Sequence, residues 1–79
     1  MSIGELEKKI GEAASFHRLA ASAVRAHRQA AFEYIRAARD ILAYVWIDME
    51  GSGEFPQAIV DRIMETEHQL VEVIRDLLR

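Results

Sequence analysis

Residues 50–57 read EGSGEFPQ, and this short stretch divides the chain into two helical arms. Glycine directly after a helix supplies the left-handed conformation that ends it, so Gly51 to Gly53 predict a helix end. Proline suits the first turn of a helix, where its missing N–H would have no partner, so Pro56 predicts the start of another helix. Two amphipathic helices joined by so short a turn form an antiparallel hairpin. The sequence therefore predicts an all-α fold built on a helical hairpin.

The helix before this turn is predicted to be long. Residues 15–50 contain neither glycine nor proline, and a continuous helix of that length would span about 54 Å. A closing helix is predicted over residues 56–78, where apolar residues recur at i, i+3 and i+4. The S-x-x-E pattern that begins at Ser2 has the form of a capping box and predicts a short helix over residues 2–12. We therefore expect a single helical domain, residues 1–79, with a long central helix and a short N-terminal one.

The composition limits the classes of protein to consider. The 79 residues include no cysteine, which excludes disulfides, thiolate metal sites and thiol nucleophiles. The net charge is −3, so we do not expect binding to nucleic acid. No apolar run approaches the roughly 18 residues that a membrane span needs, and the N-terminus lacks the pattern of a signal peptide. We therefore expect a cytoplasmic protein with no membrane contact.

The unequal arms of the predicted hairpin indicate an oligomer. The closing helix reaches only the half of the long helix nearest the turn, so residues 15–28 overhang. Two hairpins packed antiparallel would bury both overhangs in a four-helix bundle, and a helix from another protein would cover the same surface. The alanines there would let the second helix approach closely. The predicted interface of this dimer consists of Phe16, Leu19, Ala20, Ala23, Val24, His27 and Ala31.

A stripe of arginines on the other side of the long helix predicts a docking surface. At about 100° per residue, the arginines between residues 18 and 39 fall within one sector of the helix. They form either a solvated face with weak local ion pairs or a surface that binds an acidic protein segment. Aromatic residues and arginine are enriched at binding hot spots. The predicted partner-binding residues are Arg25, Arg28, Phe32, Arg36, Arg39 and Trp46.

The closing helix contains one step typical of metal sites, the E-x-x-H sequence from Glu65 to His68. Di-iron carboxylate proteins use this spacing to place a carboxylate and an imidazole one turn apart on the inner side of a bundle. Here both side chains point away from the apolar side of the helix, so we interpret them as solvated surface and expect no metal or other cofactor. The alternative is a half-site of Asp40, Glu65 and His68, completed by a second subunit.

That half-site resembles the encapsulated ferritin-like family, whose two-helix subunits form di-iron sites at a dimer interface. The resemblance covers residues 40–79 and implies a metal-binding or oxidase subunit. No serine lies within one helical turn of an inward-facing histidine and carboxylate, so we expect no catalytic residues apart from that alternative.

The plan of the whole chain resembles the small co-chaperones of type III secretion needle subunits. The resembling segments are SIGELE at residues 2–7, IRAAR at residues 35–39 and FPQ at residues 55–57. The resemblance implies a non-enzymatic helper that shields the apolar helix of a secreted client. The expected function is therefore a protein–protein interaction module, such as a co-chaperone-like or adaptor subunit that shields a partner helix.

Overall fold

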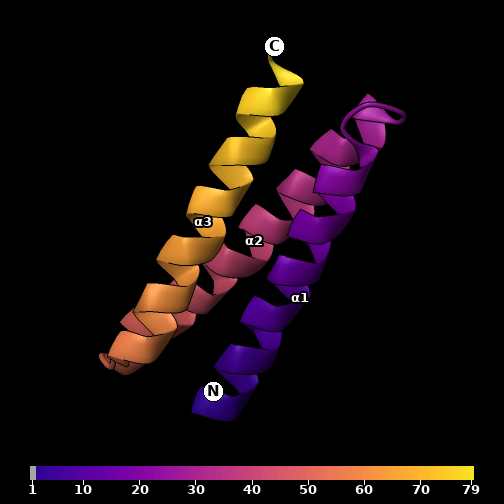
Figure 1. Ribbon diagram of the computed structural model, residues 1–79. Coiled ribbons are helices and arrows are strands. Elements are labelled where there is room, and N and C mark those ends of the chain that lie inside the picture. The colour runs from indigo at the N-terminus through magenta and orange to yellow at the C-terminus, as the bar shows by residue number, and fades with distance from the viewer. Residues whose placement is uncertain (1) are drawn as a thin grey trace.

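The computed structural model describes residues 2–79, which form three α-helices and no strand. α1 spans Ile3–Ala23, α2 spans Arg28–Ser52 and α3 spans Gln57–Leu77. Figure 1 shows α1 and α3 running in the same direction, with α2 returning between their ends. The molecule is elongated, with extents of 40 × 16 × 16 Å. The prediction of an all-α fold is confirmed.

Local sequence signals account for most of the helix ends. The Ser2 hydroxyl accepts a hydrogen bond of 3.2 Å from the backbone N–H of Glu5, which caps α1. Gly53 has a φ of 74°, and its backbone N–H donates to the Met49 carbonyl at the end of α2. Pro56 comes directly before α3. The structure therefore has a tight glycine turn and a proline between α2 and α3.

The structure differs from the predicted long helix at residues 24–27. A turn there separates α1 from α2, and α1 continues through Gly11 to Ala23 instead of ending near residue 12. His27, at the end of this turn, has the non-helical backbone angles φ −142° and ψ 66°. The continuous helix over residues 15–50 is therefore replaced by two antiparallel helices. The reason is tertiary packing, which stabilises helices more than local propensity does and tolerates one glycine inside α1.

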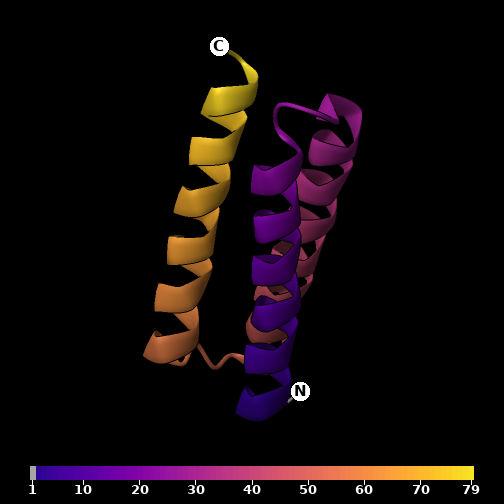
Figure 2. The same cartoon turned by 45° about the vertical axis from the view of Figure 1, so that its right-hand side comes forward.

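The core lies where α1 packs against the other two helices. α1 packs more extensively against α2 than against α3, and α2 and α3 have the least contact with each other. In Figure 2, α1 overlaps α2 while α3 stands to one side. Fully buried alanines occur on both α1 and α2, where they allow the two helices to approach; these are Ala13, Ala20, Ala31 and Ala38. Larger side chains such as Ile10, Ile59 and Leu70 fill the rest of the core.

The fold-back at residues 24–27 removes the predicted overhang. Ala20, Ala23 and Ala31 are buried within the chain, and Val24 is partly buried against the same core. The rings of Phe16 and Tyr34 stack between α1 and α2, with their centroids 6.2 Å apart. Most of the predicted dimer interface is therefore covered by the chain itself. The structure therefore lacks the overhanging arm from which the dimer was predicted. The homodimer stays a prediction, but this argument no longer supports it.

Candidate helix-binding groove

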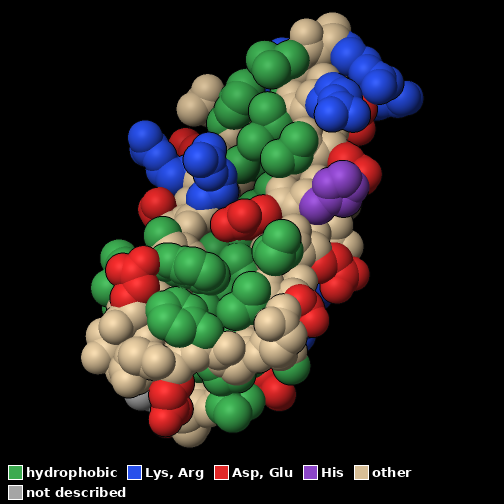
Figure 3. Space-filling view, turned by 90° about the vertical axis from the view of Figure 1, so that its left-hand side faces the viewer, with side chains coloured by type: hydrophobic (Ala, Val, Ile, Leu, Met, Phe, Trp, Pro, Cys, Tyr) green, Lys and Arg blue, Asp and Glu red, His purple; other side chains and the backbone are tan. Residues whose placement is uncertain are grey.

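An open groove of about 710 Å³ runs between α2 and α3, and its lining comes from these two helices alone. Apolar side chains dominate both walls. Figure 3 shows hydrophobic side chains gathered in a band along this face of the molecule. The lining residues of α2 are Arg39, Leu42, Ala43, Trp46 and Ile47, and those of α3 include Val60, Ile63, Met64, Glu67, Leu70, Val71 and Ile74. The fold therefore leaves an apolar groove uncovered between α2 and α3.

The groove forms because apolar residues extend beyond the buried face of each helix. On α2, Val45 is buried, and Trp46 and Ile47 follow it. On α3, Met64 and Val71 directly follow the buried Ile63 and Leu70. One position rotates a helical side chain by about 100°, which moves these followers out of the core and onto the groove.

Large hydrophobic side chains are therefore exposed along both walls. The exposed fractions are 38% for Trp46 and 65% for Ile47 on α2, and 62% for Met64 and 49% for Val71 on α3. Single exposed apolar residues are ordinary, but contiguous ones at the walls of a groove are typical of an interaction site.

An aromatic pair joins the groove to the α2–α3 turn. The Trp46 and Phe55 rings lie 5.6 Å apart and are tilted by 55°. This geometry is favourable for aromatic pairs and fixes the indole against the turn. Trp46, which was predicted to bind a partner together with the arginine stripe, therefore belongs to an apolar site.

Two charged residues lie among the apolar ones, Arg39 on the α2 wall and Glu67 on the α3 wall. Both are exposed, and within residues 2–79 neither forms an ion pair with another side chain. The apolar stems of such residues extend a hydrophobic wall while their charged groups stay in water. Their charges are available to select or orient a partner.

The fold divides the remaining residues of the predicted arginine stripe. Arg25 lies in the turn before α2, away from the groove. Arg28 begins α2, and its guanidinium donates a hydrogen bond to the backbone carbonyl of Leu77 at the end of α3. Phe32 is 42% exposed on α2 but does not line the groove, and Arg36 is exposed between Phe32 and Arg39. The structure therefore brings Arg39 and Trp46 together in one site and leaves the other four outside its lining.

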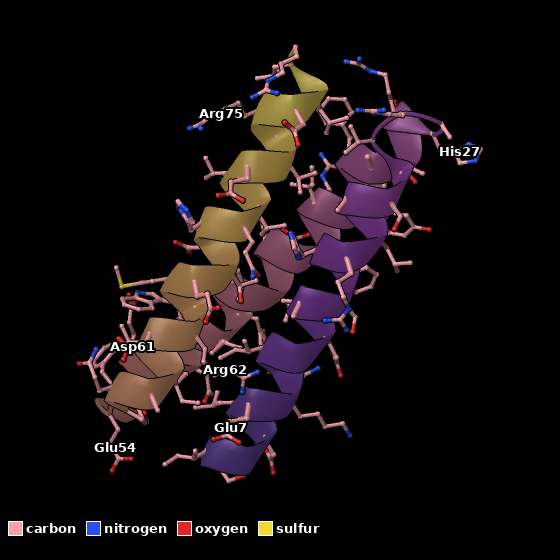
Figure 4. All side chains as sticks on the ribbon, viewed as in Figure 1. Glu7, His27, Glu54, Asp61, Arg62 and Arg75 are labelled. Atoms are coloured by element: carbon pink, nitrogen blue, oxygen red, sulfur yellow. The ribbon has the colours of Figure 1, made fainter. Side chains whose placement is uncertain are left out.

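Two residues of the predicted dimer interface remain at the surface. Leu19 is 46% exposed on α1. His27 is exposed and points outward at the α1–α2 turn (Figure 4), so it does not lie within a long helix, where the dimer interface was predicted. Neither belongs to the groove between α2 and α3.

The three ligands of the alternative metal site do not meet within one chain. Among residues 2–79, no group of three His, Asp or Glu side chains is arranged to hold an ion. Nε2 of His68 lies 3.3 Å from Oε1 of Glu72, and both side chains are largely exposed. Glu65 instead lines a shallow depression between α1 and α3, while Asp40 is exposed on α2. The metal alternative therefore depends entirely on a second subunit.

No protein-family model matches the chain, and no curated protein or solved structure matches it significantly. Within residues 2–79, no helix combines the length and apolar character needed to cross a bilayer. The cytoplasmic location stays a prediction. The functional interpretation therefore depends on the geometry and chemistry of the groove.

Proposed function

We propose that this protein is a non-enzymatic interaction module that shields an amphipathic helix of a partner in the α2–α3 groove. The observation that carries the proposal is the uncovered apolar groove with Trp46, Ile47, Met64 and Val71 exposed at its walls. In helix-in-groove recognition, the partner helix places its residues i, i+3, i+4 and i+7 into such a groove. The bound helix would turn the three-helix fold into a four-helix bundle.

The dimensions of the groove suit a short helix. The α3 wall extends from Val60 to Ile74, which corresponds to about 21 Å along a helix. A partner segment of about 14 helical residues would cover that length. Trp46 would serve as the main anchor, because a tryptophan held in place by a neighbouring ring offers a large contact area with little loss of rotamer freedom.

A designed peptide tests this function directly. The probe is an amphipathic peptide of about 18 residues with leucine at i, i+3, i+4 and i+7 and a balanced set of Lys and Glu elsewhere. Trp46 is the only tryptophan in the chain, so its fluorescence reports on the groove. We expect saturable binding with a blue shift of the tryptophan emission.

A matched pair of variants separates groove binding from general stickiness. Met64→Lys places a charge in the groove and should abolish the blue shift. Leu19→Lys makes a similar change on α1, outside the groove, and should leave the affinity within about twofold of the parent. Unchanged tryptophan emission with the parent protein, and no saturable binding, would contradict the proposed function.

A homodimer would have to use a different surface from the predicted one. The predicted interface around Ala20 and Ala23 is internal, so a second copy would have to pack against α2 and α3 instead. No geometric observation favours the metal-binding alternative over the interaction module, and that alternative stays a prediction.

A further inference from the structure

The α2–α3 groove has an acidic end and a basic end. At the α2–α3 turn, Glu50, Glu54 and Asp61 are exposed. At the opposite end, Arg36 of α2 and Arg75 of α3 are exposed. Figure 4 shows Glu54 and Asp61 at one end of the molecule and Arg75 at the other. A helix lying in the groove would therefore have opposite charges near its two ends.

Oppositely charged residues do not cancel this polarity. Arg62 is the basic residue of α3 nearest the acidic end, but it lies on the α1 side, where it lines the depression between α1 and α3. At the basic end, Asp76 lies 3.6 Å from Arg79, and Glu72 lies 3.3 Å from His68. Glu33 of α2 is a third carboxylate near this end. The four arginines there, Arg28, Arg36, Arg75 and Arg79, outnumber the three carboxylates, so this end keeps a net positive charge.

The orientation of a helix bound in the groove would depend on these charges at the two ends. The N-terminus of a helix carries a partial positive charge and the C-terminus a partial negative charge. The acidic end of the groove favours the N-terminus, and the basic end favours the C-terminus. Basic side chains in the first turns of the partner and acidic ones in its last turns would add to the same preference.

The two charged residues that line the groove distinguish the two edges of the partner. Arg39 lies on the α2 wall and Glu67 on the α3 wall. An acidic residue on the edge that faces α2 and a basic residue on the edge that faces α3 would each meet an opposite charge. Both groove residues are exposed, so these contacts select between partners more than they add affinity.

We infer that the groove accepts its partner helix in one orientation, with a basic N-terminal end at the α2–α3 turn and an acidic C-terminal end beside Arg36 and Arg75. This inference rests on the proposed function. The partner is thus an amphipathic helix of another protein, parallel to α3 and antiparallel to α2. The charge pattern of the groove identifies this partner by its polarity as well as by its apolar face.

Two peptides of identical composition test the orientation. They share one apolar face; the first carries lysines in its first two turns and glutamates in its last two, and the second has these charges exchanged. The dissociation constants are measured by Trp46 fluorescence at low salt and at 0.5 M salt, and the helicity of each free peptide is measured separately. Each end charge changes affinity by a factor of about 2 to 5. We expect the first peptide, corrected for its free helicity, to bind about tenfold more tightly at low salt, with the difference shrinking at high salt.

A spin label on the N-terminus of the first peptide locates that end. It should broaden the amide NMR signals of Glu54 and Phe55 and leave those of Arg75 and Leu78 sharp. The double variant Glu50→Gln with Glu54→Gln should reduce the affinity ratio of the two peptides several-fold. The matched control, Glu7→Gln with Glu12→Gln, removes the same charge from α1 and should leave the ratio unchanged.

Each other result has a distinct meaning. Equal binding of the two peptides, or broadening at both ends, would overturn the single orientation while leaving the groove function intact. Tighter binding of the exchanged peptide would overturn it as well. Failure of both peptides to bind would contradict the proposed function itself. Self-association of the parent that buries Trp46 and is lost in Met64→Lys would identify a second copy as the occupant and overturn the inference of a foreign helix.

Discussion

α2 takes part in two contacts that differ in how far the chain completes them. Towards α1 it presents small residues such as Ala31 and Ala38, which are completely buried. Towards α3 it presents Trp46 and Ile47, which remain 38% and 65% exposed. Small residues let two helices close on each other, whereas large residues outside the close contact hold a surface open. Residue size, more than hydrophobicity alone, therefore separates the close α1–α2 contact from the open groove between α2 and α3.

The two regions also differ in what their side chains contribute to folding. A side chain gains about 25 cal/mol for each Å² of apolar surface removed from water. The α1–α2 contact has realised that gain within the chain. The exposed side chains of the groove are still in contact with water. Their burial against a partner would release the corresponding free energy. Matched substitutions in the two regions should therefore differ in their effect on stability.

Truncating a large side chain should separate the two regions most clearly. Ile10 of α1 is 1% exposed, and Met64 on the groove is 62% exposed. We expect Ile10→Ala to lower the free energy of unfolding by about 2–5 kcal/mol, because it leaves a cavity. Met64→Ala should change it by less than about 0.5 kcal/mol. Urea unfolding followed by circular dichroism measures both, and equal losses would show that the groove is part of the folding core.

Enlarging an alanine tests the same contrast from the opposite direction. Ala38 is fully buried, whereas Ala43 lines the groove and is exposed. Ala38→Leu should destabilise the fold by about 1–3 kcal/mol, since the closely packed helices have no space for the added atoms. Ala43→Leu should leave stability nearly unchanged and alter only peptide affinity. Thermal unfolding provides the measurement, and a neutral Ala38→Leu would refute close packing at that position.

The turn that joins the two groove walls offers a pair of glycines. Gly53 has a φ of 74°, so Gly53→Ala should cost about 1–2 kcal/mol of stability through backbone strain alone. Gly51 lies within α2, and a Cβ there meets nothing within 4 Å. Gly51→Ala should therefore stabilise the protein by up to about 1 kcal/mol. Opposite signs in denaturant titrations are the expected result, and destabilisation by both would indicate that α2 ends before Gly51.

The smallest effect concerns Arg28, at the far end of the groove from the turn. Its hydrogen bond to the Leu77 carbonyl stabilises the end of α3, but its positive charge opposes the dipole at the start of α2. These effects offset each other, so Arg28→Ala should lose only about 0.5 kcal/mol. Arg25→Ala removes a similar charge without a hydrogen bond and should be neutral. The rate of amide hydrogen exchange at the end of α3 should rise in Arg28→Ala only. Equal protection in both variants would show that the Arg28 hydrogen bond does not stabilise the end of α3.

The sequence predicts some of these features well. The glycines and Pro56 locate the boundary between α2 and α3, because each has a specific backbone conformation or missing donor at a helix end. The capping pattern at Ser2 locates the start of α1 for the same reason. All three signals act through the local backbone, so they do not depend on the rest of the fold.

The break between α1 and α2 lacks such a local signal. Residues 24–27 are VRAH, with neither glycine nor proline. A continuous helix and two packed helices are both compatible with the alanine-rich sequence around them, and only the gain from burying both alanine faces decides between them. This is why the predicted overhang, and the dimer argued from it, placed internal residues at an interface.

The candidate site is foreseen only in part. Arg39 and Trp46 are expected in a partner-binding surface, but Ile47, Met64 and Val71 are not. The sequence signal that could have identified these groove residues is an apolar residue directly after a core residue. A helix cannot bury two consecutive side chains against the same neighbouring helix, so the second one stays exposed. Which of these followers share a groove depends on how α2 and α3 diverge, and that requires the three-dimensional arrangement.

The link from Arg28 to the Leu77 carbonyl has a consequence for how a partner can arrive. The chain joins α2 to α3 at one end of the groove, and this hydrogen bond joins them at the other. A segment with further chain on both sides cannot thread lengthwise between two joined ends, so it must settle sideways through the open face. No free terminus is then required. Under the proposed function, a helix in the middle of a longer polypeptide would be captured and released without passing any of its length through the protein.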